Sequence, residues 1–325
     1  MTDIILHHYP TSPFSEKVRL VLGYKNLSWQ SVVIPMIMPK PDVLALTGGY
    51  RKTPFMQIGA DIYCDSALIC DVLEKMQPEP TLYPEHHKGA ARIIAQWADT
   101  TLFWAAMAYN FSPAGSAQMF GIDSPQATEA IANAKLFADD RAKMRSGMPR
   151  LPAADAAASY KSYLRRIANM LDESPFLMGD QPCIADFAVY HPLWFTRHRT
   201  SVMAGIFNAT PNVLTWMDCM AAIGHAQSSK LNATNSIATC ANNTPAIVEN
   251  SGKNASSNSV FQDEHGIALG SLVSVASETF GPEPTEGELV AATRMHYTLR
   301  RHDDRAGTVH VHFPRIGFIL KKVEK

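Results

Sequence analysis

The 325-residue sequence contains few cysteines and no long apolar runs. Its five cysteines are an odd number without regular spacing, so they predict free thiols rather than a disulfide framework. No apolar stretch approaches the roughly 18 residues that a membrane span requires. No basic leader segment follows the first residue, so a secretory signal is not predicted. These absences predict a cytoplasmic protein without a membrane partner.

An excess of charge of either sign is also missing. The 29 Lys and Arg residues nearly balance the 30 Asp and Glu residues, giving a net charge of −1. Such a chain has no general field to attract nucleic acid, and no nucleic-acid partner is predicted. What the chain does have is 46 % hydrophobic and 18 % charged residues, which is enough apolar material for sizeable cores. Its length predicts two or three domains.

The first informative stretch joins a short apolar run, Ile4–Leu6, to the turn Ser12-Pro13-Phe14-Ser15. Apolar residues at helical spacing follow, which predicts a helix from about Ser15 to Tyr24. The free N–H groups and the dipole at a helix start stabilise an anion, a thiolate in particular. The Ser12 hydroxyl is placed to donate to such an anion. In the competing interpretation, Ser12 or Ser15 only caps the helix.

Two further motifs follow at a distance. Thr53-Pro54 stands directly before an apolar strand, Phe55–Ile58, where proline is unusual because it cannot donate to a sheet ladder. Asp65-Ser66 stands before a predicted helix, Ala67 to Lys75, which Ser66 can cap. The chain therefore alternates strands, polar turns and helix starts over its first 76 residues.

The three motifs occur in an order that resembles the amino-terminal domain of the glutathione transferases. Ser12-Pro13-Phe14-Ser15 is similar to the Cys-x-x-Cys turn of thioredoxins with oxygen in place of sulfur, so the resemblance is to the serine-type transferases. It implies an α+β multi-domain protein with a thioredoxin-like α/β domain over residues 1–78 and an all-helical domain over 85–227. The segment Gly179 to Phe187 resembles the capping segment of the family's helical domain, with Cys183 at the cap and Asp186 three residues on.

The resemblance also implies the roles of individual residues. Ser12 would donate to the glutathione sulfur, with Tyr9 and Ser15 as weaker rivals. The other implied groups are the backbone beside a cis-proline (Thr53, Pro54), the γ-glutamyl corner (Asp65, Ser66), a partner for the glycyl carboxylate (Lys40 or Arg51), and an electrophile pocket between the domains (Phe14, Trp104, Met107, Tyr109).

The implied function is conjugation of glutathione to a small hydrophobic electrophile, or displacement of a leaving group from it. Glutathione would be the co-substrate of a homodimeric detoxification enzyme without a metal. One alternative is a glutathione-dependent thiol/disulfide reductase, which would need Cys64 because both turn positions are serine. A second alternative is a non-catalytic binding or assembly protein that contacts a partner through its C-terminal segment.

The last hundred residues depart from an ordinary transferase. Residues 228–259 are dense in Asn, Ser, Thr and Ala, which predicts a poorly packed polar connector with a short helix near Ile237. Residues 260–325 predict a small antiparallel β-domain. Its expected strands are Leu272–Val275, Gly287–Leu299, Gly307–Phe313 and Ile316–Val323. Thr308, His310 and His312 would share a strand face, and a solvated face is expected there rather than a metal site.

Overall fold

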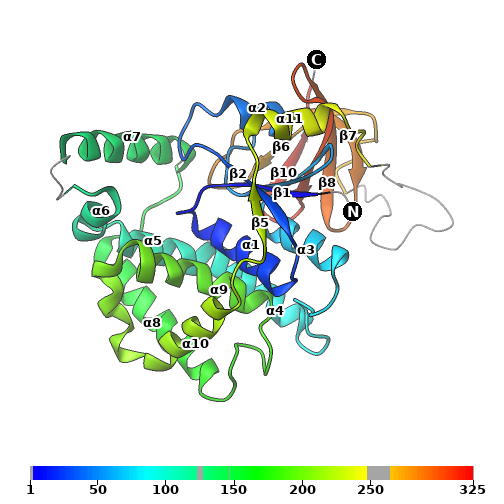
Figure 1. The fold of residues 1–325 in the computed structure, drawn as a ribbon. Helices are drawn as coiled ribbons and strands as arrows, with labels where there is room; N and C mark the ends of the chain where they lie inside the picture. Colours follow the sequence, from blue (N-terminus) through cyan, green and yellow to red (C-terminus); the bar gives the residue numbers. More distant parts are fainter. Residues whose placement is uncertain (1–2, 123–126, 146, 247–263, 325) are drawn as a thin grey trace.

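A computed structural model describes residues 3–122, 127–145, 147–246 and 264–324 (Figure 1). The N-terminal part has the predicted thioredoxin-like order of strands and helices, and the two predicted helices begin within two residues of their expected starts at Ser15 and Ala67. Its elements are β1 Ile4–His8, α1 Pro13–Tyr24, β2 Trp29–Val33, α2 Pro41–Thr47, β3 Phe55–Ile58, β4 Asp61–Cys64 and α3 Ser66–Met76. Strand β1 is parallel to β2 and antiparallel to β3, and β3 pairs with β4. The predicted cis peptide bond between Thr53 and Pro54 is present.

The helical domain packs against α1 and α3 on one side of the sheet (Figure 1). Helix α4, a π-helical segment at Ala98–Leu102 and α5 follow one another without a break. Further π and 3-10 turns at Phe195–Arg199 and Ser201–Ala209 follow α9. The α-helices are α4 Lys88–Trp97, α5 Phe103–Asn110, α6 Pro113–Phe120, α7 Ala127–Arg145, α8 Ala153–Leu171, α9 Ile184–Trp194 and α10 Pro211–Ala222.

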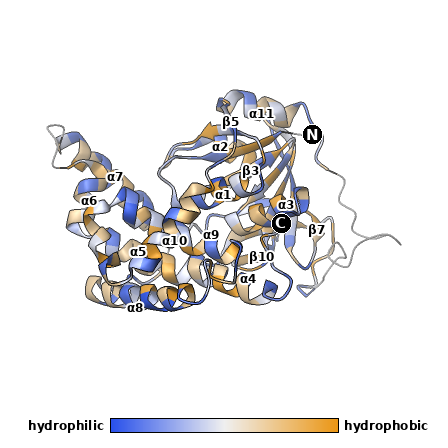
Figure 2. Cartoon of the chain, turned by 60° about the horizontal axis from the view of Figure 1, so that its bottom comes forward, coloured by the Kyte–Doolittle hydropathy of each residue, from blue (hydrophilic) through white to orange (hydrophobic). Residues whose placement is uncertain are grey.

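Helices α4, α5 and α10 of this domain pack around α9. Figure 2 shows the alternation of hydrophobic and hydrophilic positions along α8, whose Tyr160, Leu164 and Ile167 are buried. Helix α9 is buried along almost its whole length, so it is apolar on every side. None of the helices in the described part of the chain is long and apolar enough to cross a membrane.

The capping segment expected at the start of α9 is confirmed. Cys183 occupies the cap, and the Asp186 carboxylate accepts hydrogen bonds from the backbone N–H of Cys183 at 3.0 Å and of Leu177 at 2.9 Å. It also accepts from the Trp216 indole N–H of α10 at 3.0 Å. Asp186 therefore holds the start of α9 to its neighbours, and its role is structural.

The C-terminal strands extend the N-terminal sheet instead of forming a separate one. The structure contains one sheet of ten strands in the order β10-β6-β7-β8-β9-β4-β3-β1-β2-β5. The expectation of an independent small β-domain over 260–325 is corrected in this respect, because β9 pairs in parallel with the edge strand β4. The strands are β6 Leu272–Ser277, β7 Thr285–Ala292, β8 His296–Asp303, β9 Gly307–Pro314 and β10 Phe318–Lys322.

The strand expected over Gly287–Leu299 is two strands, β7 and β8, joined by a tight turn. The Thr293 hydroxyl accepts hydrogen bonds from the backbone N–H of Met295 and His296, both at 3.2 Å. A threonine that accepts from the N–H groups two and three residues on offers the backbone an alternative to the strand ladder, and these local bonds stabilise the turn. No glycine or proline marks this turn, so the sequence pattern does not predict the hairpin.

The expected connector is better packed than its composition suggests. Strand β5 (Ser228–Lys230) pairs in parallel with β2, and α11 (Ala233–Ala241) buries Ile237 and Cys240 in the sheet core. The expectation of poor packing is therefore wrong for residues 228–246, while the expected helix near Ile237 is confirmed. Residues 247–259 of the connector lie outside the described part. The polar composition gave the wrong prediction of poor packing, because a helix such as α11 needs only one apolar face to pack against a sheet.

The join between β4 and β9 contains buried polar groups. The Asp61 carboxylate on β4 accepts hydrogen bonds from His312 Nε2 at 2.8 Å and from the backbone N–H of Ala246 at 2.8 Å. The His312 ring stacks on Tyr63, and His310 Nδ1 lies 3.8 Å from the same carboxylate. The expectation of a solvated face is wrong, because both histidines are buried by the extended sheet and α3. No group of three or more potential metal-binding side chains occurs among the described residues.

We expect Asp61→Asn to lower the free energy of unfolding by about 2 kcal/mol near neutral pH, because it removes the charge that His312 and Ala246 contact. Burial alone would raise the pKa of Asp61, but the His312 hydrogen bond and charge lower it below its usual value. The carboxylate's contribution is therefore complete above about pH 4 and is lost as pH falls through the lowered pKa. Urea unfolding of both proteins across the acid range measures the difference.

The control for this experiment is Asp218→Asn, which removes an exposed carboxylate that pairs with Arg197. That variant should change the unfolding free energy by less than about 1 kcal/mol. A difference between Asp61→Asn and the unmutated protein that stayed constant from neutral to acid pH would contradict the assignment.

Candidate functional site

Ser12 caps helix α1. Its Oγ accepts a hydrogen bond from the backbone N–H of Ser15 at 3.2 Å, and Pro13 occupies the first helical position. This bond uses a lone pair of Ser12, so the hydroxyl proton stays available, and no described residue accepts it. The capping role and the predicted donor role are therefore compatible, since they use different parts of one hydroxyl group. The positive end of the α1 dipole lies at the same place.

Ser15 and Tyr9, the two rivals of Ser12, lie in different surroundings. Ser15 is buried inside the first turn of α1, as Ser12 is buried at its cap, and Ser15 Oγ has no hydrogen-bond partner among the described residues. The Tyr9 hydroxyl accepts a hydrogen bond from Arg141 of α7 at 3.4 Å, and the Tyr9 side chain packs beside the core that includes α2 and α11. Ser12 is the N-cap residue of α1 and stays the predicted donor at this helix start.

The start of α3 forms a second polar corner. Asp65, with a φ of 77°, is the N-cap, and its carboxylate accepts a hydrogen bond from the backbone N–H of Ala67 at 3.0 Å. Ser66 was expected to cap this helix but is instead its first residue. The cap is therefore the carboxylate, which adds a negative charge where the α3 dipole is positive.

A buried ion pair, which the sequence analysis missed, lies directly behind Ser66. Lys17 of α1 is buried, and its Nζ lies 2.5 Å from the carboxylate of Asp99 and 3.4 Å from Ser66 Oγ. His191 of α9 contacts the other Asp99 oxygen through Nε2 at 3.0 Å. Burial alone would raise the pKa of Asp99, but the Lys17 charge and the His191 hydrogen bond hold it below its ordinary value. This chain of contacts connects Ser66 to the helical domain.

The two cations expected near the glycyl carboxylate have partners within the protein. Lys40 is buried and donates to the Arg51 carbonyl at 3.2 Å, and burial lowers its pKa to about 8. Arg51 contacts Asp140 of α7 at 2.7 Å and Glu283 at 3.1 Å. Their role in binding stays a prediction, but neither side chain is free in this structure.

Lys52 is a cation that lies close to Asp65, and the sequence did not predict it as a site residue. Its Nζ lies 4.0 Å from Asp65 Oδ2 and donates to Ser277 Oγ at 3.1 Å. It also lies 4.8 Å from the centre of the Phe318 ring, so two residues of the C-terminal segment contact it. Burial lowers the pKa of Lys52. No sequence signal connected Lys52 to residues more than 220 positions away.

The four expected pocket residues separate into two pairs. Phe14 and Trp104 both contact Phe103, with ring centroids 4.7 Å and 4.9 Å away. Met107 is buried in the helical core, and the Tyr109 hydroxyl donates to the Met203 carbonyl at 3.1 Å. The structure therefore connects Phe14 and Trp104 through one aromatic row. Met107 and Tyr109 belong to the helical core, so their pocket role lacks support.

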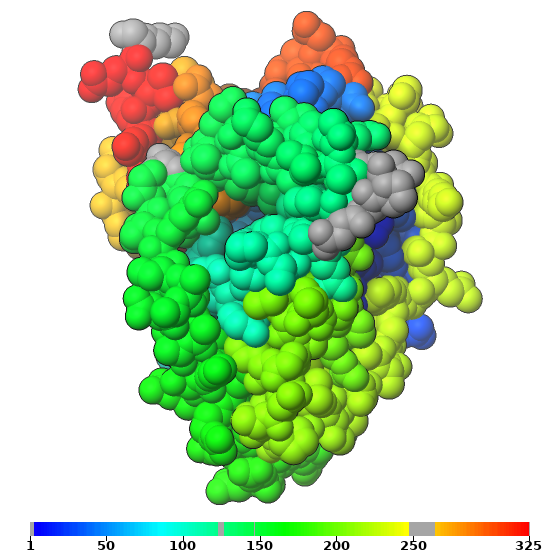
Figure 3. All heavy atoms as spheres, turned by 90° about the vertical axis from the view of Figure 1, so that its left-hand side faces the viewer, coloured from blue at the N-terminus to red at the C-terminus, as the bar shows by residue number. Residues whose placement is uncertain are grey.

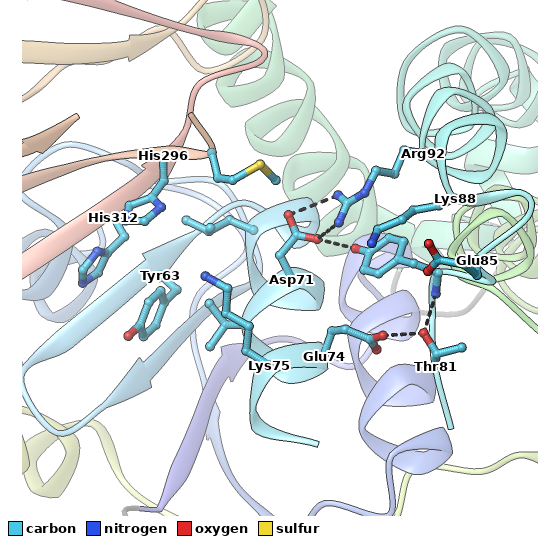
Figure 4. A pocket seen from close by; sticks show the side chains of 14 residues that line it. Tyr63, Asp71, Glu74, Lys75, Thr81, Glu85, Lys88, Arg92, His296 and His312 are labelled. Atoms are coloured by element: carbon cyan, nitrogen blue, oxygen red, sulfur yellow. Dashed lines mark hydrogen bonds and ion pairs between the residues drawn. The ribbon is translucent and has the colours of Figure 1, made fainter. Parts of the chain in front are cut away.

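A cavity of about 440 Å³ lies between α3, the start of α4 and the turn before β8 (Figure 4). None of the predicted site residues lines it. Its acidic groups are largely paired internally: Asp71 binds Arg92 at 2.9 Å, and Glu74 accepts from the Thr81 hydroxyl at 2.5 Å. These contacts join α3 to the start of the helical domain, and they do not form an assembled catalytic centre.

Cys64 offers no support for thiol chemistry. It is fully buried, and burial raises the pKa of its thiol well above the usual value. A reactive cysteine requires a low pKa and access to solvent. The described part of the chain also places no cysteine at the start of α1.

Comparison with known proteins gives matches to two parts of one family. Residues 6–81 match the glutathione S-transferase N-terminal domain, and residues 125–219 match the glutathione S-transferase C-terminal domain. No curated protein sequence matches the chain.

Two solved structures illustrate the structural similarity. A GST-like protein from Pseudomonas syringae is 38 % identical, with a TM-score of 0.77, over 99 % of this chain and 100 % of that one. The similarity therefore includes the C-terminal strands. The beta-etherase LigF from Sphingobium sp. strain SYK-6 is 16 % identical, with a TM-score of 0.51, over 68 % of this chain and 96 % of that one. This second similarity concerns the fold alone.

Proposed function

This chain belongs to the glutathione S-transferase family, and we propose that it is a glutathione transferase of the serine type. The observation that carries the proposal is the Ser12 hydroxyl, which caps α1 while keeping its proton free. Asp65 and Ser66 at the start of α3 would bind the γ-glutamyl end of glutathione. The backbone of Thr53, beside Pro54, would pair with the cysteinyl backbone.

The proposed chemistry begins with ionisation of the glutathione thiol. The Ser12 O–H donates to the sulfur, and the α1 dipole adds partial positive charge, so the thiolate is favoured near neutral pH. The thiolate then uses an electron pair to form a bond to an electrophilic carbon. In a displacement reaction, the leaving group departs with the electron pair of the broken bond.

The glycyl carboxylate of glutathione needs a cation. Lys40 and Arg51 are the proposed partners, and their contacts with the Arg51 carbonyl, Asp140 and Glu283 would have to open for this. Lys52 Nζ lies 4.0 Å from Asp65 Oδ2, so Lys52 would act at the γ-glutamyl corner and not at the glycyl end.

The rival functions have less support. A thiol/disulfide reductase needs an accessible thiolate, and Cys64 is a buried thiol with a raised pKa. A non-catalytic assembly protein would not need a free hydroxyl proton at a helix start. Family membership further supports a homodimer, a cytoplasmic location, a hydrophobic electrophile and a role in detoxification as parts of the proposal.

Calorimetric titration with glutathione tests the proposal. Ser66→Ala and Asp65→Ala should each weaken binding by about 1.5–3 kcal/mol, the range for a hydrogen bond to a charged group. Asn232→Ala is the matched control, because Asn232 also caps a helix, α11, at 2.8 Å. That control should lose stability without losing affinity. Unmutated protein that shows no heat of binding at millimolar glutathione would refute the transferase assignment.

A further inference from the structure

The segment between β6 and β7, residues 278–284, crosses from the sheet to the helical domain. At its C-terminal end, the Thr285 hydroxyl accepts from the backbone N–H of Tyr50 at 3.1 Å, and Glu283 pairs with Arg51 at 3.1 Å. These contacts fix the segment to the loop that carries Lys52 and Thr53. The segment lies outside both matched family domains, so family membership does not account for it.

The other side of the segment contacts α7. The backbone N–H of Gly281 donates to the Met144 carbonyl at 2.7 Å. Gly281 has a φ of +69°, and a Cβ there would lie 3.0 Å from Lys52 Cγ and 3.1 Å from Met144 Cε. The segment is therefore held tightly between Lys52 and α7. Figure 3 shows atoms of this C-terminal region, in orange, at the bottom of a recess among the green helices.

One side chain of the segment extends the aromatic row that begins beside Ser12. Phe14 follows Ser12 by two residues and contacts Phe103, which contacts Trp104 at 4.9 Å. The Phe280 ring lies 5.0 Å from the Trp104 ring at an angle of 59°. The row therefore runs from Phe14 in the first turn of α1 to the C-terminal segment, and its last ring is half-buried.

A cation lies at the end of this row. The Arg145 guanidinium stands 5.2 Å from the centre of the Trp104 ring. Its Nε is buried without a hydrogen-bond acceptor, and no described carboxylate pairs with it. Arg141, one turn earlier on α7, is by contrast paired with Asp140 at 2.6 Å. The position at the C-terminus of α7 favours a cation, but it does not provide an acceptor for the buried Nε.

We propose that the electrophile site accepts an aromatic compound with a carboxylate substituent, with Phe280 of the C-terminal segment contributing to binding of the ring and Arg145 of α7 selecting the carboxylate. The aromatic ring would pack against Phe280 and Trp104, and the carboxylate would accept hydrogen bonds from Arg145. An arginine suits this task because its planar donors match the geometry of a carboxylate. The inference rests on the proposed function in one respect: the reacting carbon must reach a sulfur held by Ser12.

Binding of two matched probes, para-nitrobenzoate and para-nitrobenzamide, tests the inference by calorimetry. Both probes contain the same nitro-substituted benzene ring. The benzoate carries a carboxylate where the benzamide carries a neutral amide. The unmutated protein should bind the benzoate about tenfold more tightly, the factor that one charge-assisted hydrogen bond supplies. Arg145→Gln should reduce that preference to about one, while Phe280→Ala should weaken binding of both probes about tenfold.

Two control variants change comparable residues away from the row. Lys143→Gln removes an exposed cation of the same helix, and Ile319→Ala removes an exposed apolar side chain of β10. Neither should alter the affinity for either probe. Phe280→Leu keeps an apolar side chain and removes only the ring, so it serves if the alanine variant does not fold.

The outcomes separate this inference from the proposed function. Equal affinity of the unmutated protein for the two probes overturns it, as does an equal loss of preference in Lys143→Gln. Glutathione is titrated into the same samples. Glutathione binding without a benzoate preference overturns the substrate class alone. A benzoate preference without glutathione binding leaves the aromatic site standing and refutes the transferase assignment.

Discussion

Ser12→Ala should lower kcat for glutathione conjugation by about 10²–10³-fold, the usual loss when one donor to a developing or stabilised anion is removed. The change removes the hydroxyl proton that no described residue accepts. Glutathione affinity should change little, because Asp65 and Ser66 lie at a different helix start. The ultraviolet absorbance of bound thiolate, followed against pH, should show a raised pKa of the glutathione thiol in the variant.

The same substitution removes a helix cap, so stability needs a separate control. Ser112 caps α6 in the same way, with its Oγ 3.3 Å from the backbone N–H of Gly115. Ser112→Ala should cost about 1 kcal/mol of stability, as Ser12→Ala should, but should leave kcat unchanged. If the bound thiol ionised identically with and without the Ser12 hydroxyl, the donor role would be wrong.

Asp99→Ala should lower the free energy of unfolding by about 3–5 kcal/mol, because it leaves the buried Lys17 ammonium without its carboxylate. Among the described residues, the other hydrogen-bond partner of Lys17 Nζ is Ser66 Oγ at 3.4 Å, which carries no charge. We also expect weaker glutathione binding, since Ser66 belongs to the proposed γ-glutamyl corner. Urea unfolding measures the first effect and calorimetry measures the second.

A double variant separates charge burial from side-chain loss. Lys17→Met combined with Asp99→Leu removes both charges, and it should recover much of the stability that Asp99→Ala loses. Asp155→Ala on α8 is the control for loss of an unpaired, exposed carboxylate, and it should be nearly neutral. A double variant as unstable as Asp99→Ala would show that the ion pair does not explain the effect.

Local signals in the sequence determined the thioredoxin-like part closely. Alternating apolar runs, the Thr53-Pro54 break and the helix starts at Ser12 and Asp65 depend on residues within a few positions of one another. The structure keeps each of these elements. The predicted positions of Cys183 at the cap and Asp186 three residues on are also confirmed, because a capping box depends on only four consecutive residues.

The remaining features depend on contacts between distant segments, which a sequence pattern does not specify. Pairing of β9 with β4 joined the expected β-domain to the first sheet and buried His310 and His312, which were expected to be solvated. Backbone hydrogen bonds form between any two compatible strand edges, so side-chain patterns carry little information about which edges meet. The buried ion pair of Lys17 and Asp99 could not be predicted either, because it also joins two segments that are distant in the sequence.

By itself, the sequence determined the family, the helix start at Ser12 and the corner at Asp65 and Ser66, because each depends on short-range spacing. The tertiary structure alone decided what surrounds them. It paired Arg51 with Asp140 and Glu283, brought Lys52 beside Asp65, and placed Phe280 against Trp104. Arg51 and Glu283, like Trp104 and Phe280, lie more than 170 positions apart in the chain, and only folding of the C-terminal segment onto the rest of the protein brings these two pairs into contact.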